Sequence, residues 1–173
     1  MDPEVLSITK AAIHPNCTLR KVFGLDPGFK NMGCAIVQGN QILKTWTHDF
    51  FPGNPKWKKL KREIKFQLYT NWAFELGMAL GENSVQCIVI EGQMKQDLIA
   101  LSYFLYGVWT GMGTFITVTI VHPATVKAQF GLSTGNYQNN KEMACLYTGL
   151  KNHNEADAVI TALYLNCTTQ QFF

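Results

Sequence analysis

Two apolar runs of the sequence end abruptly in an acidic residue that a chain turn follows. The run KVFGLD ends at Asp26, directly before Pro27-Gly28, and the run CIVIE ends at Glu91, directly before Gly92. Short apolar runs bounded by turn residues are typical of buried strands. We therefore expect two central strands of a sheet, each presenting a carboxylate where it leaves the sheet, although either acid alone is also typical of an ordinary turn.

The remaining segments predict how this sheet is completed. In chain order, the expected elements are strands at 21–26, 32–40 and 41–50, a helix at 55–80, a strand at 85–91, a helix from about 97, a strand through 120, a short helix near 125 and two closing helices. This order describes an α/β fold with a mixed five-stranded sheet flanked by helices. We expect residues 1–20 to be an N-terminal extension and 21–173 to form a single domain.

One uncharged stretch raises the question of a membrane span. Residues 98–121 pass 24 positions without a charge, which is long enough to cross a bilayer. The second half is rich in β-branched residues and ends at His122-Pro123, as a buried strand would, and Gly111 and Gly113 mark a turn between the halves. We therefore expect a helix followed by a strand, and no membrane partner.

Basic residues are concentrated in one segment, although the net charge is only +3. Between positions 56 and 65 the chain carries Lys56, Lys58, Lys59, Lys61, Arg62 and Lys65. Such a run indicates either a polyanionic partner or a solvated helix.

A third acid lies in the last predicted helix, within NEADAVITALYL. Small residues there would let the helix approach the sheet closely, and positions 154 and 157 are three apart, so Asn154 and Asp157 share one helical face. If that face meets the strand ends, both join Asp26 and Glu91. Clustered carboxylates suit Mg²⁺ or Mn²⁺, and a pair of such ions can promote phosphodiester hydrolysis. Alone, Asp157 is also typical of a helix N-terminus.

Several segments resemble, in the same order, the RuvC-like Holliday junction resolvases, and most closely their poxvirus branch, within the RNase H-like superfamily. The matching pieces are GLDPGFKNMG at 24–33, IVIEGQ at 88–93, HPATVKAQFG at 122–131, Lys141, and NEADAVITAL at 154–163. The resemblance implies a structure-selective endonuclease that cuts four-way DNA junctions by paired symmetric nicks.

The resemblance also implies the roles of individual residues. Asp26, Glu91 and Asp157 would be ligands of two Mg²⁺ or Mn²⁺ ions, and Asn154 would occupy a ligand position that is usually acidic. Lys127 and Lys141 would lie near the scissile phosphate or the junction backbone. We therefore expect Asp26, Glu91, Asn154, Asp157 and Lys127 to form the catalytic site.

Asn154 departs from the family pattern. One hypothesis is an engineered Asp→Asn change that traps an inactive enzyme, because asparagine has nearly the shape of aspartate without its charge. The competing hypothesis is a natural asparagine, with His153 or Glu155 supplying the ligand. Glu155 points about 100° away from position 154 on a helix and is the weaker substitute.

Two surfaces are expected to serve DNA binding and assembly. Lys58, Lys61, Arg62 and Lys65 recur at helical spacing and would contact junction phosphates. The helix at 98–112 has a second apolar face, formed by Ile99, Tyr103 and Tyr106, which predicts a homodimer. The poxvirus likeness implies a role in resolving viral genome concatemers in the host cytoplasm.

Two alternatives belong to other functional classes. DPGFKNMG also fits the phosphate loop of actin-like ATPases and sugar kinases, but those proteins need two such domains, so we expect no nucleotide cofactor. The other alternative is a non-catalytic scaffold that binds junctions, with Asn154 as the native residue.

Overall fold

The computed structural model describes residues 6–7, 19–53, 56–132 and 136–168. One sheet runs through it in the order β1-β4-β3-β2-β5-β6. The strands are β1 Leu6–Ser7, β2 Lys21–Asp26, β3 Asn31–Gln38, β4 Gln41–Asp49, β5 Cys87–Glu91 and β6 Thr117–Val121. β2 pairs antiparallel with β3 and parallel with β5. The predicted mixed sheet of five strands is confirmed, and β1, within the expected extension, adds a short sixth strand beside β4.

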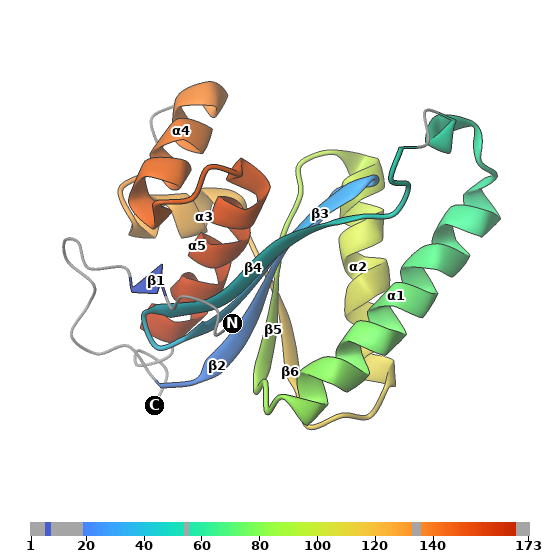
Figure 1. The fold of residues 1–173 in the computed structure, drawn as a ribbon, viewed down its shortest axis with the longest axis horizontal. Helices are drawn as coiled ribbons and strands as arrows, with labels where there is room; N and C mark the ends of the chain where they lie inside the picture. Colours follow the sequence, from blue (N-terminus) through green and yellow to red (C-terminus); the bar gives the residue numbers. More distant parts are fainter. Residues whose placement is uncertain (1–5, 8–18, 54–55, 133–135, 169–173) are drawn as a thin grey trace.

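The helices cover both faces of this sheet. They are η1 Trp57–Lys59, α1 Arg62–Glu82, α2 Gln96–Gly111, α3 Pro123–Gln129, α4 Tyr137–Thr148 and α5 His153–Thr168. α1 and α2 lie on one side, whereas α3, α4 and α5 lie on the other (Figure 1). The uncharged stretch divides into α2 and β6, as expected. Across the described ranges, no helix has the length and apolar character that a membrane crossing requires.

Two glycines let α5 pack closely on the sheet. A Cβ atom at Gly24 of β2 would overlap the carbonyl oxygen of Ala158, and one at Gly33 of β3 would overlap that of Asn154. The facing alanines, Ala158 and Ala162, are fully buried. The first turns of α5 are therefore held beside the end of β2.

The opposite face of the sheet is covered by α1 and α2. Leu101, Leu105 and Trp109 of α2 are buried, and the indole of Trp109 donates a hydrogen bond of 2.8 Å to the carbonyl oxygen of Ala73 in α1. This bond satisfies a polar group inside the core. It also fixes the two helices against each other.

The first long helix begins later than the sequence predicts. α1 starts at Arg62, and the 3₁₀ turn η1 precedes it. Leu60 and Lys61 have extended backbones, with ψ of 140° and 146°, so they interrupt the helix. Pro55, the expected start, lies outside the described residues.

Candidate metal centre

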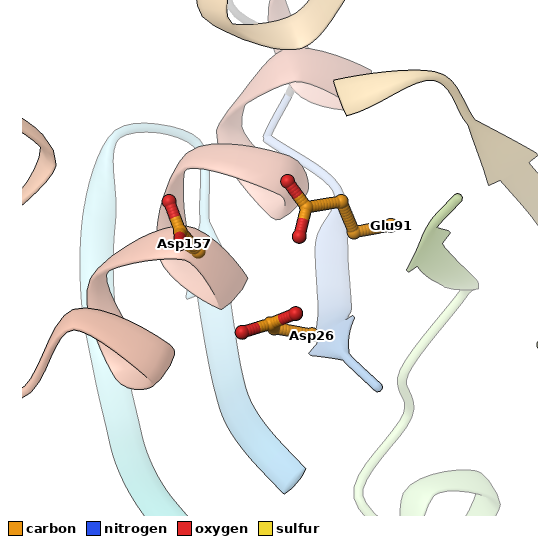
Figure 2. A group of neighbouring side chains, drawn as sticks. All are labelled: Asp26, Glu91 and Asp157. Carbon is orange, nitrogen blue, oxygen red and sulfur yellow. The ribbon is translucent and has the colours of Figure 1, made fainter. Parts of the chain in front are cut away.

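Three carboxylates converge at one edge of the sheet. Asp26 is the last residue of β2 and Glu91 the last of β5, and these strands are parallel neighbours, with Leu25 opposite Ile90. Asp157 reaches the same point from α5. One oxygen from each carboxylate lies within 4.8 Å of the others, and the three groups face one another in Figure 2.

This arrangement disfavours three negative charges without a cation. Burial, together with the nearby charge of Asp157, raises the pKa of Asp26 from 3.8 to about 6. Burial and the charges of Asp26 and Asp157 raise the pKa of Glu91 well above its usual range. Burial also raises the pKa of Asp157, although the Lys127 ammonium opposes this effect. A bound cation would relieve the conflict.

Lys127 of α3 supplies a positive charge at this point. Its ammonium lies 3.4 Å from Asp157 Oδ1 and 3.7 Å from Glu91 Oε1. Burial lowers the pKa of the ammonium, but the carboxylates of Glu91 and Asp157 raise it by more. Lys127 therefore stays charged and partly neutralises the cluster.

Gln93 holds two of the carboxylates in place. Its amide nitrogen donates to Asp26 Oδ1 at 3.2 Å and to Glu91 Oε2 at 3.5 Å. The preceding backbone is fixed because Gly92 N donates to the carbonyl oxygen of Val121 at 2.7 Å. Gln93 had no predicted role, and the only sequence signal for one was its position two residues after Glu91.

A cavity of about 580 Å³ opens above the cluster. Besides the three acids, its lining includes Lys127, Lys141, His153 and Asn154. The structure thus brings all the residues that the sequence proposed as catalytic to one cavity. It adds Lys95 and His122, which the sequence analysis had left without a role.

Asn154 has one neighbour that can replace an acidic ligand. Glu155, the weaker substitute, accepts a hydrogen bond of 3.1 Å from the Thr47 hydroxyl of β4 and does not line the cavity. His153 does line it, so His153 is the neighbour that can replace the acidic ligand.

Asn152 caps the start of α5, because its Oδ1 accepts a hydrogen bond from Asn154 N at 3.0 Å. The position of Asn154 is therefore fixed by the helix start.

The chemistry of the cluster fits a hard divalent cation. Asp157 Oδ1 is buried, and the described part of the protein offers it no hydrogen bond of good geometry. Its ion pair with Lys127 is longer than a strong charge-assisted hydrogen bond. Carboxylate oxygens are the ligands that Mg²⁺ and Mn²⁺ prefer. Asp26, Glu91 and Asp157 would hold such an ion, and the Asn154 amide oxygen could add a neutral ligand.

Unlike Lys141, the four residues of the basic segment that were predicted to bind DNA lie outside this cavity. Lys58 is in η1, Lys61 precedes α1, and Arg62 and Lys65 are in its first turn. The sequence predicted that all four lie on one continuous helix. This prediction is wrong, because the chain is extended at Leu60 and Lys61. None of the four lines the acidic cavity.

Comparison with solved structures identifies the fold. Thermus thermophilus RuvC in complex with a Holliday junction substrate matches with a TM-score of 0.62 and 17% identity, over 88% of this chain and 96% of that one. The yeast mitochondrial Holliday junction resolvase Ydc2 matches with a TM-score of 0.61 and 13% identity, over 91% and 84%. No family model and no curated protein matches the sequence. The chain therefore has the RuvC-like, RNase H-like fold that its sequence predicts.

Proposed function

We propose that this protein is a metal-dependent endonuclease that resolves four-way DNA junctions. The observation that carries the proposal is the convergence of Asp26, Glu91 and Asp157 within 4.8 Å in a RuvC-like fold. The matching RuvC structure contains a Holliday junction substrate. A similar substrate for this chain is in keeping with the lysines around its acidic cavity.

The residues of the cavity would divide the work of phosphodiester hydrolysis. Asp26, Glu91 and Asp157 would hold Mg²⁺ or Mn²⁺, two ions per site, which lower the pKa of water and offset charge on the phosphate. Lys127 and Lys141 would attract and orient the scissile phosphate. Gln93 would keep the carboxylates of Asp26 and Glu91 turned toward the ions.

Asn154 would weaken this site without disturbing the fold. An aspartate there would add a negative ligand one helical turn from Asp157, on the same face of α5. An asparagine keeps the shape and removes the charge, so we expect the second ion to bind poorly. We propose that Asn154 stands in place of an aspartate and that this chain is an inactivated form.

Assembly as a homodimer would provide two active sites for paired symmetric nicks. The second apolar face of α2 is open, with exposed fractions of 37% for Ile99, 63% for Tyr103 and 37% for Tyr106. α1, on the same side of the sheet, exposes Phe74 and Met78. Several exposed apolar side chains on two helices of one side of the sheet favour a protein partner.

The poxvirus likeness of the motifs supports a more specific role. We propose that the enzyme resolves concatemers of a viral genome in the cytoplasm of the host.

The actin-like alternative requires two domains, whereas the described residues form one sheet. ATP binding without junction binding would favour that alternative.

Junction cleavage by Asn154→Asp tests the proposal. The unaltered chain, Asn154→Asp and the double variant Asn154→Asp with Asp26→Asn would each be incubated with a synthetic four-way junction in Mg²⁺ or Mn²⁺. We expect paired nicks from Asn154→Asp, and at least about 100-fold slower cleavage when Asp26 is also replaced.

A scaffold that only binds junctions is the second candidate, and Asn154 itself favours it. A scaffold would bind the junction in all three forms and cut it in none. That result would overturn the nuclease proposal, whereas cleavage restored by Asn154→Asp would exclude the scaffold.

A further inference from the structure

A second cavity, of about 480 Å³, lies between η1, the start of α1 and the chain that follows β2. We call it the aromatic pocket, because Phe29, Trp57, Phe66 and Tyr69 contribute to its wall. Lys58, Arg62 and Lys65 also line it. They are three of the four residues from the basic segment that were predicted to bind DNA and that do not line the acidic cavity.

The aromatic pocket adjoins the metal centre. Phe29 follows Asp26 by three residues, and Asp97 of α2 lines the aromatic pocket while the next residue, Leu98, lines the acidic cavity. Figure 1 shows the start of α1 at the same end of the sheet as the start of α2. A DNA strand with a phosphate at the acidic cluster can therefore reach the pocket with a nearby nucleotide.

Trp57 of the pocket packs on a neighbouring ring, and basic side chains lie over Trp57 and Phe66. Phe51 stacks on Trp57 with ring centroids 6.1 Å apart and planes at 21°. The Lys65 ammonium is 5.1 Å from the centre of the Trp57 ring, and the Arg62 guanidinium is 5.6 Å from that of Phe66. Long basic side chains can turn toward a phosphate, which would leave these ring faces free for a base.

The charges indicate which part of a nucleotide enters. Asp97 on the pocket wall would repel a phosphate, whereas Lys58 and Arg62 are exposed and would attract one outside. Tyr69 is nearly fully buried, and its hydroxyl donates 2.7 Å to the carbonyl oxygen of Phe29, which fixes the inner wall. An aromatic interior with a cationic rim suits a flat base whose phosphate stays at the surface.

We propose that the aromatic pocket binds one unstacked nucleobase of the DNA strand that passes the metal centre. The inference rests on the proposed function, because it requires DNA as the ligand. It extends that function by giving the basic segment at 56–65 a second task beyond neutralising phosphates. A base held there would be withdrawn from the stack near the point where the junction branches, where pairing is weakest.

Position-by-position removal of bases tests the proposal without metal or cleavage. A four-way junction would carry one abasic nucleotide at successive positions around the branch point, and its affinity would be measured in EDTA. We expect the unaltered chain to lose roughly 5- to 100-fold in affinity at one or two positions. A flat profile would overturn the proposal.

Two ring variants establish where that base is bound. Trp57→Ala should weaken binding of the intact junction and lose the dependence on abasic position, whereas Trp57→Phe should keep it. Phe115→Ala is the matched control, because Phe115 is fully exposed and precedes β6, at the opposite end of the sheet. An unchanged profile in Trp57→Ala would overturn the proposal.

The same binding data separate this inference from the proposed function. A clear preference for the junction over a duplex, combined with a flat abasic profile, would overturn the pocket alone and leave the proposed function standing. Equal affinity for junction and duplex, or no DNA binding, would overturn both.

Discussion

The candidate metal centre and the aromatic pocket lie side by side at the start of α2, yet they are built from different kinds of segment. Asp26 and Glu91 end buried strands, and α5 is pressed onto the sheet beside them. The pocket is formed by η1 and the first turns of α1, whose basic residues are mostly exposed. In the acidic cluster, the fold fixes where the carboxylates lie. In the aromatic pocket, the basic side chains are long and can move to meet a ligand.

The packing that positions the candidate metal centre should be intolerant of added volume, and Gly33→Ala is the most severe test of this. A methyl group there would overlap the backbone of Asn154, so α5 must shift. We expect the free energy of unfolding in urea to fall by about 3 kcal/mol. The matched control is Gly107→Ala in α2, where an added Cβ meets nothing within 4 Å. It should be neutral or stabilising by roughly 0.5–1 kcal/mol, and equal losses in both variants would contradict the account.

Buried charge should also make the stability of the metal-free protein depend on pH. The pKa of Asp26 is about 6 in the folded state, against 3.8 ordinarily, so the folded state binds this proton more tightly than the unfolded state. Stability therefore falls as pH rises from about 4 to about 6. The cost from Asp26 is absent below this window and reaches about 3 kcal/mol above it.

Unfolding in urea with EDTA, measured between pH 4 and pH 8, would show this fall. Asp26→Asn should have a shallower profile, because it lacks the titrating group. Mg²⁺ should reduce the fall in the unaltered chain, since it neutralises the deprotonated cluster. Parallel profiles for the unaltered chain and Asp26→Asn would show that Asp26 does not titrate abnormally.

Lys127→Met removes the positive charge that lies beside the acidic cluster. The variant leaves Glu91 and Asp157 without their ammonium partner. We expect the metal-free protein to lose about 2 kcal/mol of stability at pH 7. Calorimetry should show Mn²⁺ binding several-fold more tightly, because one repulsive charge is gone. Lys59→Met, at an exposed position, is the control and should change neither stability nor Mn²⁺ affinity. Weaker Mn²⁺ binding by Lys127→Met would contradict the view that the Lys127 ammonium repels the ion.

The smallest effect is expected at the exposed cations of the aromatic pocket. Arg62→Gln should weaken DNA binding modestly and reduce the slope of log affinity against log salt by about 1, as the loss of one phosphate contact predicts. Lys44→Gln on β4 serves as control, because Lys44 lines neither cavity. An identical salt slope for Arg62→Gln and the unaltered chain would place Arg62 outside the DNA path.

The sheet and the acidic cluster were predictable because each depends on short patterns. Asp26 and Glu91 follow short apolar runs that are typical of buried strands, and parallel neighbours bring the ends of such strands together. The spacing of Asn154 and Asp157 defines one face of a helix. Gly33 did not reveal its role in the sequence, because the close approach of α5 depends on packing between distant segments.

The surface features were harder to predict. The basic run from Trp57 to Lys65 continues the helical pattern of α1, so nothing local revealed the extended backbone at Leu60 and Lys61. The hydrogen bonds of Gln93 depend on the path of the chain after β5. Two-residue β1 carries too little pattern to be recognised at all.

Locating Mn²⁺ directly would test the central claim, that the three carboxylates form a metal centre. Crystals of Asn154→Asp soaked in Mn²⁺ would be examined by anomalous diffraction, with Asp26→Asn crystals treated identically. The account predicts an anomalous peak among Asp26, Glu91 and Asp157, with Lys127 moved away from them, and a weak or absent peak in Asp26→Asn. No peak at the cluster, with the Lys127 ammonium still beside Asp157, would contradict it.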